Sequence, residues 1–107
     1  MHKILLGFGC LFALALGVST AQANDCGEVS IMQGDWGSAQ IVTAVAKFLM
    51  QEGYGCDVTA IPLSSNPALA SVSETGEPDI LTEIWTNAAP AYQGLVDSGA
   101  IIPVNEV

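Results

Sequence analysis

Two tryptophans, each with an acidic residue close by, are the side chains of this sequence best suited to recognise a small molecule. Trp36 directly follows Asp35, and Trp85 comes two positions after Glu83. An indole face attracts an organic cation by about 0.5 to 2 kcal/mol, and carboxylates add attraction over a longer range. The alternative is that one or both tryptophans only pack against the fold, as large aromatic side chains commonly do. The pair therefore indicates a cation site only if the fold brings the two indoles to one place.

The composition removes most of the side chains on which enzymes depend. The only histidine is His2, there is no arginine, and the two basic side chains are Lys3 and Lys47. Catalytic triads, imidazole metal sites and guanidinium clamps are therefore unavailable in the main part of the chain. We expect no enzyme, no cofactor and no metal. The formal net charge of −9 repels nucleic acid and anionic lipid, so neither is an expected partner.

Residues 1–23 have the three parts of an export signal. His2 and Lys3 precede the apolar run 4–18, and Ala21-Gln22-Ala23 is a small-residue cleavage site. The apolar run is shorter than the roughly twenty residues of a membrane helix. We predict cleavage after Ala23, a periplasmic location and no membrane insertion after cleavage.

Two cysteines, Cys26 and Cys56, follow the predicted cleavage site. An even pair in an oxidising compartment is typical of a disulfide, and the spacing fits neither a CxxC redox motif nor a metal site. A Cys26–Cys56 bridge would stabilise the fold by about 3 to 4 kcal/mol in the chain-entropy model.

The elements that must position these residues alternate between strands and helices. Strands are predicted at 28–33, 57–61 and 79–85, and helices at 38–53, 66–73 and 87–98, with the approach to a fourth strand at 100–104. Ser38 and Asn66 are the predicted N-caps of the first two helices. This alternation predicts an α/β fold with a parallel, doubly wound sheet and helices on both faces.

The first predicted helix has an apolar face at helical spacing. Its members are Ile41, Ala44, Val45, Phe48 and Leu49.

Ligands of open parallel sheets bind beyond the carboxyl ends of the strands. Trp36 follows the first predicted strand and Trp85 ends the third, so both indoles are expected at one edge. Ser64, Ser65 and Asn66 follow the second strand at a helix N-terminus, where N–H groups favour an anion. Ordinary helix capping is the alternative role for these three residues.

Three segments give the chain a resemblance to a known family. They are Gln33–Gly37, Phe48–Gly55 and Asp79–Trp85, and they resemble the opening of the glycine betaine, choline and proline-betaine substrate-binding proteins of ABC importers. The resemblance implies that Trp36 and Trp85 belong to an aromatic box around a quaternary ammonium group. Asp35, for its charge, Ser64, Ser65 and Asn66, for their place at a helix N-terminus, and Asn87 are further candidate ligand contacts.

The same resemblance implies the architecture and the partners. Residues 24–107 would be the N-terminal part of lobe 1 of a type II periplasmic-binding-protein fold, with the second lobe absent. The partners would be a small quaternary ammonium solute and the permease and ATPase of the importer. Some choline-type relatives carry an Asp where this chain has Gly37 and Ser38, which favours glycine betaine. The alternative function is a small acidic periplasmic interaction module without a role in transport.

Overall fold

Strands and helices alternate along the part of the chain that the structure describes, residues 26–105 of this computed structural model. The predicted signal peptide and its cleavage site lie outside that range. The elements in order are β1 (Glu28–Gln33), α1 (Gly37–Tyr54), β2 (Asp57–Pro62), α2 (Ser65–Thr75), the 3-10 helix η1 (Thr86–Ala88) and α3 (Tyr92–Asp97). No helix among these residues is long and apolar enough to cross a membrane.

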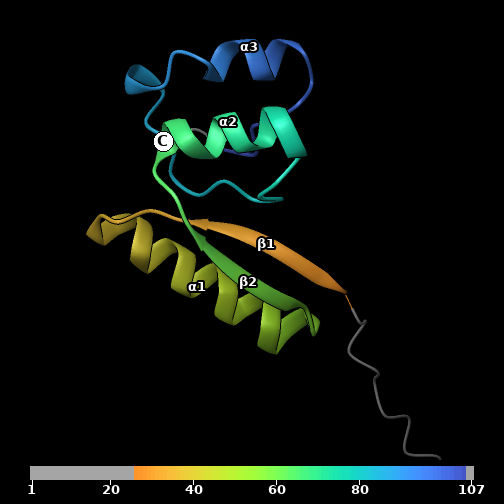
Figure 1. Ribbon diagram of the computed structural model, residues 1–107. Coiled ribbons are helices and arrows are strands. Elements are labelled where there is room, and N and C mark those ends of the chain that lie inside the picture. The colour runs from red at the N-terminus through yellow and green to blue at the C-terminus, as the bar shows by residue number, and fades with distance from the viewer. Residues whose placement is uncertain (1–25, 106–107) are drawn as a thin grey trace, which may run out of the picture.

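The two strands lie parallel, in a register that runs from Glu28 opposite Asp57 to Gln33 opposite Pro62. Helix α1 connects them and lies along one side of the strands, while α2 and α3 lie on the other side (Figure 1). The core between α1 and the strands centres on Ile31, Cys56 and Val58. This β-α-β unit confirms the α/β fold class.

The predicted third strand, 79–85, is wrong in its length. Only Ile80 pairs with β1, through a parallel bridge to Ile31. The Ile80 N–H donates to the Ser30 carbonyl at 3.1 Å, and the Met32 N–H donates to the Ile80 carbonyl at 2.9 Å. On either side of this bridge, side chains bond to β1. The Asp79 carboxylate accepts the Ser30 N–H at 2.7 Å, and the Thr82 hydroxyl donates to the Met32 carbonyl at 3.0 Å. These side-chain bonds account for the early end of the strand.

A buried hydroxyl pair joins α1 to the segment that follows Ile80. The Thr43 and Thr82 hydroxyls both lie 3.0 Å from the Met32 carbonyl oxygen and 2.9 Å from each other. The two hydroxyls have two protons for these three contacts, so one hydroxyl can donate to the carbonyl while the other donates to its neighbour. Hydrogen bonds to the Met32 carbonyl oxygen thereby connect the carboxyl end of β1 to helix α1 and to residue 82.

The apolar face predicted for α1 is not the face that packs on the sheet. Ile41, Val45, Phe48 and Leu49 are all more than half exposed, and Ala44 is exposed as well. The packed face has Ala39 and Thr43 fully or nearly buried, with Ala46 and Met50 against the core. Since α1 is apolar around most of its circumference, spacing alone did not identify the face. Small side chains and the Thr43 hydroxyl let the helix approach β1 closely.

Both predicted N-caps lie inside their helices. Helix α1 begins at Gly37 with Trp36 as its N-cap, and α2 begins at Ser65 with Ser64 as its N-cap. The two residues predicted as N-caps form other hydrogen bonds. The Ser38 hydroxyl donates to Glu83, and the Asn66 amide donates to the Ala88 carbonyl.

The predicted C-terminal elements also differ. Instead of one helix at 87–98, the chain forms η1 and α3 with a turn around Pro90 between them, and residues 100–105 form no strand. Proline has no N–H to donate to a continuous helix, which accounts for the break.

The expected disulfide between Cys26 and Cys56 is present, with a Cα–Cα distance of 4.6 Å. Cys26 lies two residues before the start of β1, and Cys56 lies directly before β2. The two cysteines lie close together because the parallel strands begin at the same edge of the sheet.

Candidate functional site

Trp36 lies at the junction between β1 and α1, and Gly34 sets the position of its ring. A Cβ atom at Gly34 would lie 2.6 Å from Cζ3 and 2.7 Å from Cη2 of Trp36, and 2.8 Å from the Cβ of Ala39. No side chain fits in that space, so the far edge of the indole lies directly over the glycine backbone. Gly34 therefore makes room for the indole.

Glu83 holds the other end of the same indole. The Trp36 Nε1–H donates to Glu83 Oε1 at 3.0 Å, and the Ser38 hydroxyl donates to the same oxygen at 2.7 Å. Helix α1 has no acidic residue in its own first turn. A carboxylate from a distant segment therefore lies at the N-terminal turn of this helix, where the helix dipole favours negative charge.

The surroundings of Glu83 keep it ionised. The hydrogen bond from Ser38, and next the one from Trp36, hold the pKa of the Glu83 carboxyl below its ordinary value, partly opposed by desolvation. The Trp85 side chain makes a weaker hydrogen-bonding contribution in the same direction. Glu83 thus bonds to one of the two tryptophans, Trp36, and lies two residues before the other, Trp85. Its carboxylate is negatively charged at neutral pH.

Trp85 is the more open of the two tryptophans, with 56% of its surface exposed. It is the N-cap of η1, and its carbonyl accepts the Ala88 N–H at 3.0 Å. The Asn66 side-chain amide donates to the Ala88 carbonyl at 3.2 Å, which ties η1 to the first turn of α2. Asn66 therefore helps to place the turn that carries Trp85.

The remaining predicted ligand contacts lie at loop and helix ends. Asp35 is exposed in the bend between β1 and α1, and Asn87 is exposed within η1. Ser64 is the exposed N-cap of α2, and Ser65 is its partly buried first residue. The Ser64 side chain makes no capping hydrogen bond.

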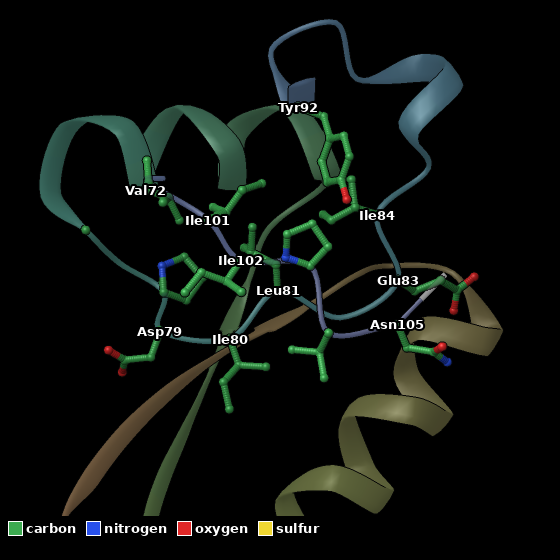
Figure 2. A pocket seen from close by; sticks show the side chains of 15 residues that line it. Val72, Asp79, Ile80, Leu81, Glu83, Ile84, Tyr92, Ile101, Ile102 and Asn105 are labelled. Carbon is green, nitrogen blue, oxygen red and sulfur yellow. The ribbon is translucent and has the colours of Figure 1, made fainter. Parts of the chain in front are cut away.

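A cavity of about 540 Å³ lies next to this site, between α2 and the segments 78–84 and 100–105. Most of its wall is apolar, with Val72, Ile80, Leu81 and Ile101 among the lining residues, and Glu83 lies at the end beside α1 (Figure 2). Neither tryptophan lines it. A smaller cavity of about 480 Å³ shares Ile84, Tyr92 and Asn105 with it.

The sequence did not reveal the roles of three residues in and next to this site. Ser38 was interpreted as a helix cap and Tyr92 was given no role, although Tyr92 lines both cavities. Glu83 was expected to attract a cation only from a distance, whereas it bonds directly to Trp36. The one available signal was the position of Glu83 two residues before Trp85 at the end of a predicted strand.

The described residues include side-chain types that attract an organic cation, but no cluster of the kind that holds a metal ion. Two indoles and an ionised carboxylate are the groups that favour an organic cation. No group of three histidine, cysteine or acidic side chains within residues 26–105 is arranged to hold a metal ion.

The parallel β-α-β unit of the described residues is consistent with part of a binding-protein lobe. Residues 27–106 match the OpuAC family, described as the substrate binding domain of an ABC-type glycine betaine transport system, and the chain belongs to that family. This is a family of transport proteins and not of enzymes. Its members are typically extracytoplasmic. No curated individual protein matches the chain.

Proposed function

We propose that this protein captures a quaternary ammonium solute, with glycine betaine as the favoured ligand, for import by an ABC transporter. The observation that carries the proposal is the hydrogen bond from Trp36 to Glu83, with Trp85 two residues beyond Glu83 in the chain. A trimethylammonium group has no hydrogen to donate, so aromatic faces and a nearby negative charge are the interactions open to it. Family membership supports the same ligand class.

The charge of Glu83 also gives the bound zwitterion a direction. The ammonium end would face Trp36, Trp85 and Glu83, and the carboxylate would point away from Glu83. We propose that Ser64 and Ser65 at the start of α2 receive the carboxylate, because a helix N-terminus offers free N–H groups and a favourable dipole. Asp35 and Asn87 are proposed as peripheral contacts on the two tryptophan-bearing turns.

The expected affinity of this chain is modest. Trp85 is more than half exposed, so the described residues leave a bound cation partly hydrated. Two cation–π contacts at exposed sites contribute only about 0.5 to 1 kcal/mol each. With the attraction of Glu83, a Kd on the order of 1 mM is expected.

The remaining parts of the proposal concern location and partners. We propose that the chain is exported to the periplasm, cleaved after Ala23, and delivers its ligand to a membrane permease driven by an ATPase. The disulfide supports an oxidising compartment. N-terminal sequencing of the exported protein should begin at Asn24, and an uncleaved N-terminus would contradict the predicted signal.

Tryptophan fluorescence tests the ligand. The chain has only two tryptophans, so every change in emission reports on Trp36 or Trp85. Glycine betaine, choline and tetramethylammonium should each produce a saturable change, whereas the uncharged analogue tert-butanol should produce none. Equal responses to tert-butanol and tetramethylammonium would contradict a cation site. Saturation that is unchanged in Trp85→Ala would remove Trp85 from the box.

A further inference from the structure

We propose that Glu83 is the positioning residue of the aromatic site: it holds the Trp36 indole by its N–H in the orientation that a cation requires. The ligand class used here rests on the proposed function, whereas the role of Glu83 is argued from the geometry of its hydrogen bonds. The Trp36 Nε1 to Glu83 Oε1 distance is 3.0 Å, and the bond joins a residue between β1 and α1 to one that lies 47 positions later in the sequence, beyond β2.

The indole is held at both ends. Its benzo edge, at Cζ3 and Cη2, lies over the Gly34 backbone, and its pyrrole N–H is held by Glu83. Contact over glycine alone lets a ring slide or tilt, because packing has no direction. A hydrogen bond weakens steeply when it bends, so the Glu83 contact removes the remaining freedom. The ring face is then available in one orientation.

Glu83 is itself held in an unusual conformation. Its φ of 49° lies in the left-handed region, and it is the only non-glycine residue with positive φ among residues 26–105. Such backbone persists only where neighbouring contacts over-determine it, and it clusters at functional sites. The preceding residue, Thr82, is anchored to the Met32 carbonyl, and the Glu83 carboxylate is anchored by Ser38. The backbone turn at Glu83 directs its carboxylate to α1.

The carboxylate has a second effect on the ring. An indole that donates its N–H to an anion becomes polarised toward a more negative ring, so its face attracts a cation more strongly. A neutral acceptor at position 83 keeps the orientation but polarises the ring less. Glu83→Gln and Glu83→Ala therefore separate the two contributions, because only the amide retains an acceptor for Trp36.

The first arm of the test needs no ligand. The two indole N–H signals of the exported full chain are resolved by nitrogen-15 NMR, and Trp85→Phe assigns the signal of Trp36. In Glu83→Ala the Trp36 N–H should exchange with solvent about five to ten times faster, as expected for loss of one hydrogen bond. In Glu83→Gln the rate should stay within about twofold of the wild type. Unchanged exchange in a folded Glu83→Ala protein would overturn the proposal.

The second arm uses tetramethylammonium as the probe. Its Kd should rise about tenfold in Glu83→Ala and about threefold in Glu83→Gln, since the first loses orientation and charge and the second only charge. Glu52→Gln, in the last turn of α1, makes the same charge change far from the site and should leave the Kd unchanged. Equal weakening in Glu83→Ala and Glu83→Gln would show that charge alone acts and would overturn the positioning role.

The two arms separate this inference from the proposed function. If the wild-type chain does not bind tetramethylammonium, the proposed ligand class fails, while the exchange rate of the Trp36 N–H still decides whether Glu83 positions the ring. If Glu83→Ala does not fold, Glu83→Met removes the acceptor with a side chain of similar length, and the same exchange rate is expected.

Discussion

Ser30 and Asp79 exchange three hydrogen bonds at the edge of β1. Asp79 Oδ2 accepts both the N–H and the hydroxyl of Ser30 at 2.7 Å, and the Asp79 N–H donates to the Ser30 hydroxyl oxygen at 2.9 Å. The bond from the Ser30 N–H, followed by that from its hydroxyl, holds the pKa of Asp79 below its ordinary value against the effect of desolvation. The carboxylate thus adds hydrogen bonds to the edge of β1 where its second neighbour, after β2, is only the one-residue bridge at Ile80.

This lowered pKa predicts a loss of stability in acid. Asp79 binds its proton more readily in the unfolded chain, so its contribution is fully present above the unfolded pKa of about 4 and disappears as the pH falls through the lower folded value. Urea unfolding midpoints measured from pH 6 down to pH 2.5 should decrease across that window. Asp79→Asn should be less stable than the wild type at pH 6, and the two should converge toward pH 2.5. A constant difference between them would contradict the role of the charge.

A substitution at Gly34 should displace Trp36. Gly34→Ala places a methyl group in the space taken by the indole, and overpacking of this kind costs about 1 to 3 kcal/mol. The emission spectrum of Trp36 should shift, and tetramethylammonium binding should weaken. Gly53→Ala is the matched control, because it lies within α1 with open space around the new methyl. That change should stabilise the protein by about 0.5 to 1 kcal/mol, and a similar loss in both variants would contradict the steric explanation.

The hydroxyl pair should show strong coupling. Thr43→Val or Thr82→Val alone leaves one hydroxyl to donate to the Met32 carbonyl, so each should cost about 1 kcal/mol. The double substitution leaves that carbonyl without either donor and should cost more than the sum, by about 1 kcal/mol. The free energies of unfolding of the wild type, the two single variants and the double variant, measured in denaturant, give the double-mutant cycle. Additive costs would show that the two threonines act independently.

The exposed apolar face of α1 should contribute little to the stability of the fold. Phe48→Gln should change the free energy of unfolding by less than about 0.5 kcal/mol, because the Phe48 side chain is 62% exposed. Met50→Ala, which truncates a side chain packed on the core, should cost about 1 to 3 kcal/mol. Equal costs would mean that Phe48 is covered in solution.

Local signals in the sequence were sufficient for much of the fold. The β1 and β2 residues, the β-α-β order, the glycine ends of α1 and α2 and the disulfide could all be predicted, since each depends on nearby residues or on chain topology. The packed face of α1 could not, because the helix is apolar on two faces. The length of the third strand depended on the side chains of Asp79 and Thr82 bonding to β1, which residue preferences do not reveal.

The site was partly predictable for the same reason. The order of strands and helices placed both tryptophans after predicted strands. The role of Glu83 depends on its bond to Ser38, which lies far away in the sequence, and a sequence pattern does not show which distant residues come into contact.

The Met32 carbonyl oxygen connects the two segments that carry Trp36 and Glu83. Through Thr43 it is bonded to α1, which begins directly after Trp36, and through Thr82 it is bonded to the residue that precedes Glu83. Because both hydroxyls bond to one oxygen, a displacement of this peptide group is expected to reach both segments. We therefore expect substitutions that break the threonine pair to change ligand affinity as well, in addition to those at Glu83 and Gly34.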